Sequence, residues 1–519
     1  MLRHERRLLS SKGNLWRSVG LIAVATAISR VSGLFRDVSI ADVFGTSSNL
    51  DAYIIAFALP HLLRSLFAEG ALANAFIPVF STYLSQSREK ADRFASNVLT
   101  LSLFAFPLIV GLGIWLAPHY IPFLADGFSV DKQRLAISLT RITFPFIALV
   151  GLAALAMGIQ NSYGRFFVPA FAPVLFNLGV ISGALLISAQ FQRPIYGLAV
   201  GALLGGLGQL LFQAPFVRPY LRYHFVFDPF DEGIRRLVRL MLPAVLGLIV
   251  IEVNFLVDNK LASHLSSGSI AALQYASRLF QLPLGVFALS IATAILPQLA
   301  HQAARARHEE FLKTLRQGLR SAALILLPAI AGLYVLGVPI IRLLFQHGQF
   351  QAADTLRTWS VLQFLLIGLL GYGISYVINR AFYALQETTR PVQISVLIMG
   401  VNVLSDYLLI GPLGLRGLAL ATSIAGLISM ILLFFAVQHR LRTKLLTPVL
   451  GAELLKMLLI AGLMGLLTHL FYSWLVLWLG YELLQVGLAV LFGTAFYGGL
   501  AWWGGLLKRE MLPLARRQT

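Results

Sequence analysis

The sequence contains no cysteine and few charged residues. Of its 519 residues, 12% are charged and only 22 are acidic. The missing thiols exclude disulfides, thiol catalysis and cysteine-ligated metals. A soluble domain typically carries about 25% charged residues, so the low charge excludes an ordinary soluble protein. The chain also lacks the G-x-x-x-x-G-K-[ST] motif, which excludes a P-loop ATPase motor.

Long apolar runs fill most of the chain. Hydrophobic residues make up 58% of it, and the mean hydropathy is +0.78. A membrane-spanning helix needs roughly 20 apolar residues, and 14 blocks of that size occur in the sequence. Strict alternation is not sustained, which favours helices over a β-barrel. The blocks are centred near residues 30, 68, 108, 147, 178, 207, 250, 285, 330, 370, 400, 428, 460 and 495.

The basic residues indicate the orientation of these helices. Counted from an inside N-terminus, 27 of the 41 Lys and Arg residues fall in segments on one side, Arg165 among them, and six fall on the other. Lys and Arg accumulate in cytoplasmic loops, so both termini are predicted to be cytoplasmic. The net charge of +19 then reflects loops that face anionic lipid, and nucleic acid is not an expected partner.

An internal repeat divides the chain. Three pairs of segments match at offsets of 219 to 222 residues. The pairs are "ANAFIPVFS" (73–81) with "ATAILPQLA" (292–300), "GLAVGALLGGL" (197–207) with "GLALATSIAGL" (417–427), and "NSYGRFFVPAFAPVL" (161–175) with "YALQETTRPVQISVL" (383–397). Each repeat would hold an even number of helices, so both run in the same membrane direction. Parallel repeats of this kind are typical of alternating-access transporters that bind substrate between the halves.

The fold class predicted from these features is an all-α integral membrane protein with about 14 transmembrane helices. Two parallel six-helix repeats are followed by two further helices. The predicted domains are a basic cytoplasmic N-terminus (1–16), an N-terminal bundle (17–220), a C-terminal bundle (237–442), two extra helices (450–508) and a cytoplasmic tail (509–519).

Several charges lie inside the predicted spans. An Arg or Asp at the bilayer centre costs about 2.5–3.5 kcal/mol on insertion scales, so such residues are expected to pair or to bind a ligand. Four arginines could converge on a cleft between the bundles: Arg30, Arg36, Arg64 and Arg278. Guanidinium groups bind phosphate oxygens bidentately, which makes a lipid-linked diphosphate a suitable ligand. The alternative is salt bridging that only locks helices together, with Asp51 and Glu69 among the acidic candidates.

A second group of polar residues is acidic. Asn402 and Asp406 lie four residues apart, on one helical face. Asp258 and Thr422 belong to two other predicted helices. Carboxylate, amide and hydroxyl oxygens are ligands that suit Na⁺ or a proton relay. The alternative is a packed hydrogen-bond network, and Lys260 weakens the cation hypothesis unless its side chain points away.

At these residues the sequence resembles the MurJ/MviN family of lipid II flippases. This family belongs to the multidrug/oligosaccharidyl-lipid/polysaccharide exporter superfamily, which has a MATE-like fold. The resemblance covers nearly the whole chain. The motifs that carry it are "SRVSGLFRD" (29–37), "LPHLLRSLFAEGALANAFIPV" (59–79), "NSYGRFFVPAFAPVLFN" (161–177), "SSGSIAALQYASRLFQLPLGVF" (266–287) and "LFQHGQF" (344–350).

The resemblance implies a transporter rather than an enzyme. Its substrate would be lipid II, the undecaprenyl-diphosphate-linked peptidoglycan precursor, carried to the outer leaflet of the bacterial inner membrane for cell-wall synthesis. No cofactor is implied beyond Na⁺ or membrane-potential coupling. Phospholipids and the peptidoglycan-synthesis machinery would be further partners.

The resemblance also implies roles for particular residues. Arg30, Arg36, Arg64 and Arg278 would line the cavity, and Asp51 and Glu69 match acidic positions of the family. Its sodium site maps onto Asp258, Asn402, Asp406 and Thr422, and the last two helices would form a groove for the lipid tail. The sequence departs from the family pattern at His61, Ser65, Ser277 and Gln281, which leaves the partners of the arginines open.

Three other functions compete with this prediction. A polysaccharide-lipid or cation-coupled drug exporter would share the fold, but a drug site is expected to be acidic and aromatic rather than rich in arginine. A polyprenyl-phosphate-dependent enzyme would need paired carboxylates in its outer loops, and the loops hold no D-x-D motif. A channel is less compatible with parallel six-helix repeats.

Overall fold

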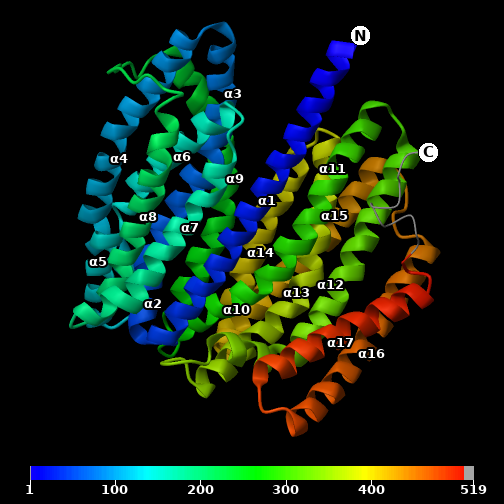
Figure 1. Cartoon of the computed structure of the whole chain (residues 1–519). Helices are drawn as coiled ribbons and strands as arrows, with labels where there is room; N and C mark the ends of the chain where they lie inside the picture. Colours follow the sequence, from blue (N-terminus) through cyan, green and yellow to red (C-terminus); the bar gives the residue numbers. More distant parts are fainter. Residues whose placement is uncertain (1, 508–519) are drawn as a thin grey trace. The chain divides into compact units, whose positions relative to one another are not determined.

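The structure is entirely helical in its described part. The computed structural model describes residues 2–507, with the backbone alone at residues 2–19, 22, 68–71, 74, 244 and 246–251. Within this range every regular element is a helix and no strand occurs, which confirms the all-α fold class. Contacts divide the chain into two compact units, Met1–Ala271 and Ala272–Thr519. Figure 1 shows the helices of both units, coloured along the chain.

The first unit contains the helices that precede residue 272. They are α1 (Leu2–Phe44), α2 (Ser48–Arg64), η1 (Ser65–Gly70), α3 (Ala71–Gln86), α4 (Arg88–Leu124), α5 (Val130–Thr143), α6 (Phe146–Ser162), α7 (Phe167–Ser182), η2 (Gly183–Ile187), η3 (Ser188–Gln190), α8 (Ile195–Val217) and α9 (Glu232–Ala262). Serine hydroxyls begin three of these helices. Ser47, Ser87 and Ser129 each accept a hydrogen bond from the backbone N–H three residues later, which satisfies a donor that the first turn leaves unpaired.

The second unit contains the remaining helices. They are α10 (Ser269–Pro283, which begins in the first unit), η4 (Leu284–Ala288), α11 (Leu289–Ala304), α12 (His308–Phe345), α13 (Ala352–Ala384), α14 (Thr389–Leu413), α15 (Leu415–Leu441), α16 (Pro448–Trp478) and α17 (Glu482–Trp503). The last two helices run side by side (Figure 1) and pack on α12. A partly buried ion pair fixes α16 to α12, because Arg320 of α12 lies 2.8 Å from Glu453 of α16.

Each unit has an apolar core made by helices distant in sequence. In the first unit, Phe76 lies between Phe80 and Phe94, with ring centroids 5.3 and 5.6 Å away. These rings join α3 to α4 within a cluster that includes Leu237 of α9. In the second unit, Leu327 of α12, Met464 of α16 and Tyr497 of α17 belong to one cluster. Aromatic pairs at such distances add to the stabilisation from burial.

Close helix contact in the first unit depends on glycine. Gly179 and Gly183 lie against Gly201 and Gly205, where α7 and the π-helical turn η2 meet α8. A Cβ added at Gly201 would lie only 2.4 Å from the Cα of Gly183. Backbones approach this closely in membrane helices where small residues repeat every four positions, so the glycine ridge holds α7 and α8 together.

The helices repeat along the chain at the spacing found in the sequence. The π-helical turns η1 and η4 begin at Ser65 and Leu284, an offset of 219 residues. Four later helix starts (α4, α5, α7 and α8) recur in α12, α13, α14 and α15 at offsets of 220 to 222 residues. A π-helical turn inside a helix is rare, so its recurrence at this offset supports the duplication. The division into two six-helix domains stays a prediction.

The break between the two compact units falls later than the predicted domain boundary. The sequence places that boundary between residues 220 and 237, whereas the first unit ends at Ala271. The reason is the packing of α9, which lies against α3 and α4 of the first unit. Leu237 of α9 is buried in the cluster around Phe76.

Twelve helical segments among the described residues are long and apolar enough to span a membrane. Eleven of them contain the centre of a predicted span, and the twelfth, Ser48–Phe67, ends just before the predicted centre near residue 68. This is therefore a multi-pass membrane protein. The predicted spans near residues 30 and 250 fall on α1 and α9, which are helical but are not among the twelve. The total of 14 therefore stays a prediction.

Candidate functional site

Charges on α1 are held by a polar cluster with α7. The Arg36 guanidinium lies 2.7 Å from the Asp37 carboxylate and donates a second hydrogen bond, of 3.2 Å, to the side-chain oxygen of Asn177. The Asn177 amide in turn donates to the Ser32 hydroxyl at 2.9 Å and to the Ser29 carbonyl at 3.2 Å. Both charged side chains are mostly buried, at 17% and 15% exposed. Arg36 is therefore neutralised locally and joins α1 to α7.

Arg30 lies in a different environment from Arg36. It is exposed, and it forms no hydrogen bond or ion pair with any described residue. A guanidinium without a partner in an apolar helix is costly unless it faces water or a ligand. Of the three predicted site arginines in the first unit, Arg30 is the exposed one, and its role in binding an anion stays a prediction.

Arg64 is the last residue of α2, directly before the π-helical turn η1. Its side chain is half-buried, and its charge acts on Glu252 of α9. Pro60 lies one turn earlier in the same helix. Proline removes a helical hydrogen bond, and π-helical turns occur frequently at functional sites. The local backbone is therefore irregular where Arg64 is presented.

Glu252 of α9 lies close to His61 and Ser65, two of the positions where the sequence departs from the family pattern. The Ser65 hydroxyl donates a 2.7 Å hydrogen bond to Glu252. The His61 ring nitrogen Nδ1 lies 3.8 Å from the other carboxylate oxygen, and its ring packs on Phe255 with centroids 5.8 Å apart. A carboxylate close to Arg64 thus limits the net positive charge here. The side chain of Glu69 lies outside the described residues.

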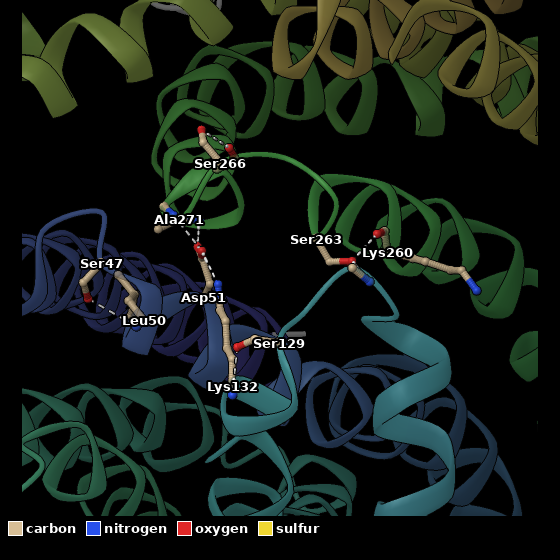
Figure 2. Close-up of polar contacts among 12 residues, drawn as sticks. Ser47, Leu50, Asp51, Ser129, Lys132, Lys260, Ser263, Ser266 and Ala271 are labelled. Atoms are coloured by element: carbon tan, nitrogen blue, oxygen red, sulfur yellow. Dashed lines mark hydrogen bonds and ion pairs between the residues drawn. The ribbon is translucent and has the colours of Figure 1, made fainter. Parts of the chain in front are cut away.

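Asp51 is buried and fully engaged in the first unit (Figure 2). It is 1% exposed, and the ammonium group of Lys132 lies 2.9 Å from its carboxylate. The backbone N–H groups of Gly268 and Ala271 donate to the same carboxylate at 2.7 and 3.0 Å. These donors flank the first turn of α10, where a negative charge is favourable. The geometry gives Asp51 a structural role, and its assignment to the substrate stays a prediction.

Lys260 points away from Asp258 and towards the loop after α4. Its ammonium group lies 3.2 Å from Asp126, donates a 2.9 Å hydrogen bond to the carbonyl of Phe123 and lies over the ring of Phe123. His264 also bonds to Asp126, at 2.8 Å. The lysine is therefore occupied, and it no longer argues against a cation near Asp258, which is half-buried on α9.

These contacts change the acidity of Asp126, which lies between α4 and α5. Partial burial disfavours its charged form, but the hydrogen bonds from Lys260 and His264 outweigh that effect. Together they lower the pKa of the Asp126 carboxyl below its ordinary value. The contacts of ionised Asp126 with Lys260 and His264 therefore stabilise the folded protein at neutral pH. This contribution to the free energy of unfolding is lost as the pH falls through the lowered pKa.

The remaining predicted site residues belong to the second unit. Arg278 is exposed on α10. Asn402 and Asp406 are 3% and 0% exposed on α14. Thr422 lies on α15, which packs on α14, and its hydroxyl donates to the Leu418 carbonyl at 3.1 Å. The structure thus places an amide and a carboxylate, one helical turn apart, inside the second unit. The cleft that Arg278 is expected to share with the other arginines stays a prediction.

Sequence reasoning missed two residues that shape this site. Asn177 is a lone polar residue in the apolar segment "FVPAFAPVLFNLGV" (167–180), and it binds Arg36. Lys132, near the start of α5, neutralises the buried Asp51. A polar residue isolated in a span is the signal that could have revealed Asn177, whereas no pattern along the chain pairs Lys132 with Asp51.

Comparison with known sequences gives one consistent result. The family model described as "Lipid II flippase MurJ" matches residues 40–486. A "Probable lipid II flippase MurJ" of Vibrio cholerae is 35% identical over 438 residues, which cover 81% of this chain and 82% of the relative. A "Lipid II flippase MurJ" of Burkholderia cenocepacia is 31% identical over 435 residues, which cover 82% of this chain and 84% of the relative.

Solved structures agree with the sequences. A structure titled "Lipid II flippase MurJ, inward closed conformation" matches with a TM-score of 0.81 and 31% identity, covering 94% of this chain and all of the other. An inward-facing multidrug transporter of the MATE family matches with a TM-score of 0.70 and 18% identity. The match covers 81% of this chain and 98% of that transporter. The second likeness is one of fold alone.

The buried pair of Asp51 and Lys132 gives a testable expectation. Lys132→Met should destabilise the protein by about 3–5 kcal/mol, because it leaves a buried carboxylate without its counter-charge. The double variant Asp51→Asn with Lys132→Met should recover part of that loss. Denaturant unfolding of the protein in detergent measures both effects.

Arg134→Met is the matched control for this cycle. Arg134 pairs with Asp131, and both side chains are mostly exposed, at 76% and 94%, so the loss should be about 0–1 kcal/mol. Equal stability of the Lys132 and Arg134 variants would show that the buried pair has no structural role.

Proposed function

This chain belongs to the MurJ family of lipid II flippases, and on that premise we propose that it moves lipid II across a bacterial inner membrane. The observation that carries the proposal is the match of the family model over residues 40–486. The protein is a transporter rather than an enzyme. Lipid II enters from the inner leaflet and leaves to the outer leaflet, where peptidoglycan is built.

The chemistry of the arginines supports this substrate. A diphosphate carries negative oxygens that guanidinium groups bind in pairs. Arg30 is exposed and lacks a partner among the described residues, and Arg278 is exposed on α10. Arg36 and Arg64 lie close to acidic groups, so they supply a weaker net field. Arg30 is the residue of the first unit that we assign to binding the diphosphate, and the role of Arg278 stays a prediction.

Alternating access provides the transport step. The head group occupies a polar cavity while the isoprenoid tail remains in lipid, beside the apolar faces of α16 and α17. Leu459 and Leu491 on these helices are 64% and 66% exposed, as a lipid-facing surface requires. Both termini then lie in the cytoplasm, in line with the excess of basic residues on that side.

A drug exporter of the same superfamily is not favoured. The multidrug transporters that match this chain share only its fold, at 18–19% identity. An organic cation would also be repelled by the exposed guanidinium groups. The family match therefore decides between the two functions.

Na⁺ or the membrane potential drives the cycle in this proposal. Asn402 and Asp406 bring an amide and a carboxylate to one buried face of α14, and Thr422 adds a hydroxyl from α15. The assignment of Asp258, on α9 of the first unit, to this set stays a prediction. Among the described residues no cluster of three or more His, Cys, Asp or Glu could hold a metal ion, so the oxygen ligands of this set suit Na⁺ better than a transition metal.

Removing Arg30 tests the substrate assignment. Arg30→Ala should lower lipid II flipping by about 10- to 100-fold, because a charged hydrogen bond is worth about 1.5–3 kcal/mol. Arg30→Lys should restore activity only in part, since an ammonium group lacks the planar fork. Flipping by the reconstituted protein in liposomes measures both.

Arg93→Ala is the control, because Arg93 is equally exposed but lies on the first turns of α4. Arg93→Ala should keep full flipping activity. All three variants should keep the expression level and thermal stability of the wild type. Wild-type flipping by Arg30→Ala would remove this residue from the binding site.

Replacing Asp406 tests the coupling. Asp406→Asn should abolish the stimulation of flipping by a Na⁺ gradient while lipid II binding persists. Asp131→Asn, at a carboxylate whose side chain is 94% exposed, serves as the control. If Na⁺ stimulates the wild type and the Asp406 variant equally, α14 does not hold the ion.

A further inference from the structure

A pocket of about 330 Å³ opens in the first unit, and none of the residues assigned to transport lines it. It lies where the end of α6, the start of α7 and the end of α8 meet. Its lining includes Gln160, Arg165, Phe167, Phe216 and Tyr220. Arg165 lies in a segment predicted to be cytoplasmic, so the pocket is at the inner membrane surface.

The backbone turn after α6 builds one wall of the pocket. Gly164 has a φ of +72°, in the left-handed region. The N–H of Arg165 then donates to the carbonyl of Gln160 at 2.9 Å, and the N–H of Gly164 donates to the carbonyl of Asn161 at 3.0 Å. This pair of bonds is a helix-ending motif that requires glycine at the turn. It fixes Arg165 over the end of the helix that carries Gln160.

Gln160 presents a buried acceptor without a donor. Its side chain is 0% exposed, and its amide nitrogen donates to the Ala156 carbonyl at 3.3 Å and to the side-chain oxygen of Gln213 at 3.4 Å. Both neighbours are oxygens that accept, so the nitrogen must face them. Its Oε1 is left with no hydrogen bond from the described residues. Because this oxygen has no exposed surface, it lies behind the wall of the pocket, and Arg165 supplies the polar group that a ligand reaches.

Arg165 presents a pre-oriented guanidinium. Its Nε donates to the Tyr220 hydroxyl at 2.9 Å, and the Tyr220 ring packs on Tyr163 with centroids 4.7 Å apart. Within the described residues, no acceptor takes a hydrogen bond from its terminal amino groups. Two parallel N–H donors on a fixed plane match two phosphate oxygens.

The rim of the pocket is aromatic and exposed. Phe166, Phe167 and Phe216 are 42%, 41% and 47% exposed. Aromatic rings are enriched at the membrane–water interface, and basic pockets between helices on the cytoplasmic side bind anionic lipid head groups. An apolar rim fits the glycerol and upper acyl chains of a lipid, which free phosphate lacks.

We propose that this pocket binds the head group of an anionic phospholipid. The lipid phosphate accepts hydrogen bonds from the terminal amino groups of Arg165. The rings at the rim hold the start of the acyl chains. The site is separate from the arginines assigned to lipid II, so it stands or falls independently of the flippase function.

Retained lipid measured by native mass spectrometry tests the proposal. The full chain is released from nanodiscs made of phosphatidylcholine with phosphatidylglycerol as the probe. The wild type should retain one phosphatidylglycerol, and Arg165→Gln should lower its occupancy by about tenfold. Arg93→Gln, an equally exposed arginine outside the pocket, is the control and should bind as the wild type does.

Two results would overturn the proposal. Equal retention by Arg165→Gln, Arg93→Gln and the wild type would show that the pocket holds no lipid. Displacement of phosphatidylglycerol by millimolar inorganic phosphate would show that the pocket recognises the anion and not the lipid. Because Arg165 is exposed, replacing its side chain is not expected to prevent folding.

Discussion

The cost of a charge in hydrocarbon governs this structure. Each ionised side chain in a span costs about 2.5–3.5 kcal/mol unless it is paired or wetted. The first unit meets that cost in two ways. Asp51 is neutralised by Lys132 and two backbone N–H groups, and Arg36 is neutralised by Asp37. Arg30 has no counter-charge and no hydrogen-bond partner among the described residues. A charge without either is expected to face water or a ligand.

This distinction separates structural from functional charges. Asp51 and Lys132 hold the start of α10 against α2 and α5, and Arg320 with Glu453 holds α16 against α12. Such pairs rigidify each unit, which a transporter that moves its halves as bodies requires. Arg30 and Arg278 are exposed, and their role in binding an anion is a proposal that these packing contacts do not test.

Much of the fold could be predicted from the sequence, because apolar length fixes where helices run. The blocks near residues 330, 370, 400 and 428 coincide with α12 to α15, and the offset of the repeat recurs in the turns η1 and η4. The packing of α9 with the first unit could not be predicted. It depends on contacts such as Leu237 with the Phe76 cluster, and hydropathy carries no information about which neighbour a helix chooses.

The candidate site could be predicted less completely, since pairing depends on three-dimensional proximity. Arginines stand out in an apolar run, so Arg30 and Arg36 were identifiable. Arg36, unlike Arg30, is held by a hydrogen bond to Asn177, which lies 141 residues away in the sequence. Glu252 could be recognised as a buried charge, but its hydrogen bond with Ser65 spans 187 residues. Side chains that meet across such separations leave no periodic signal.

The central claim is that the Arg30 position faces water rather than lipid, and thiol labelling tests it most directly. The chain has no cysteine of its own, so Arg30→Cys places a single reactive group. Leu466→Cys, at a side chain 57% exposed in the middle of α16, reports a lipid-facing site. A charged, membrane-impermeant thiol reagent should modify the first and spare the second, because a thiolate forms only in water. If both positions resist the reagent equally, Arg30 lies in lipid and the account is contradicted.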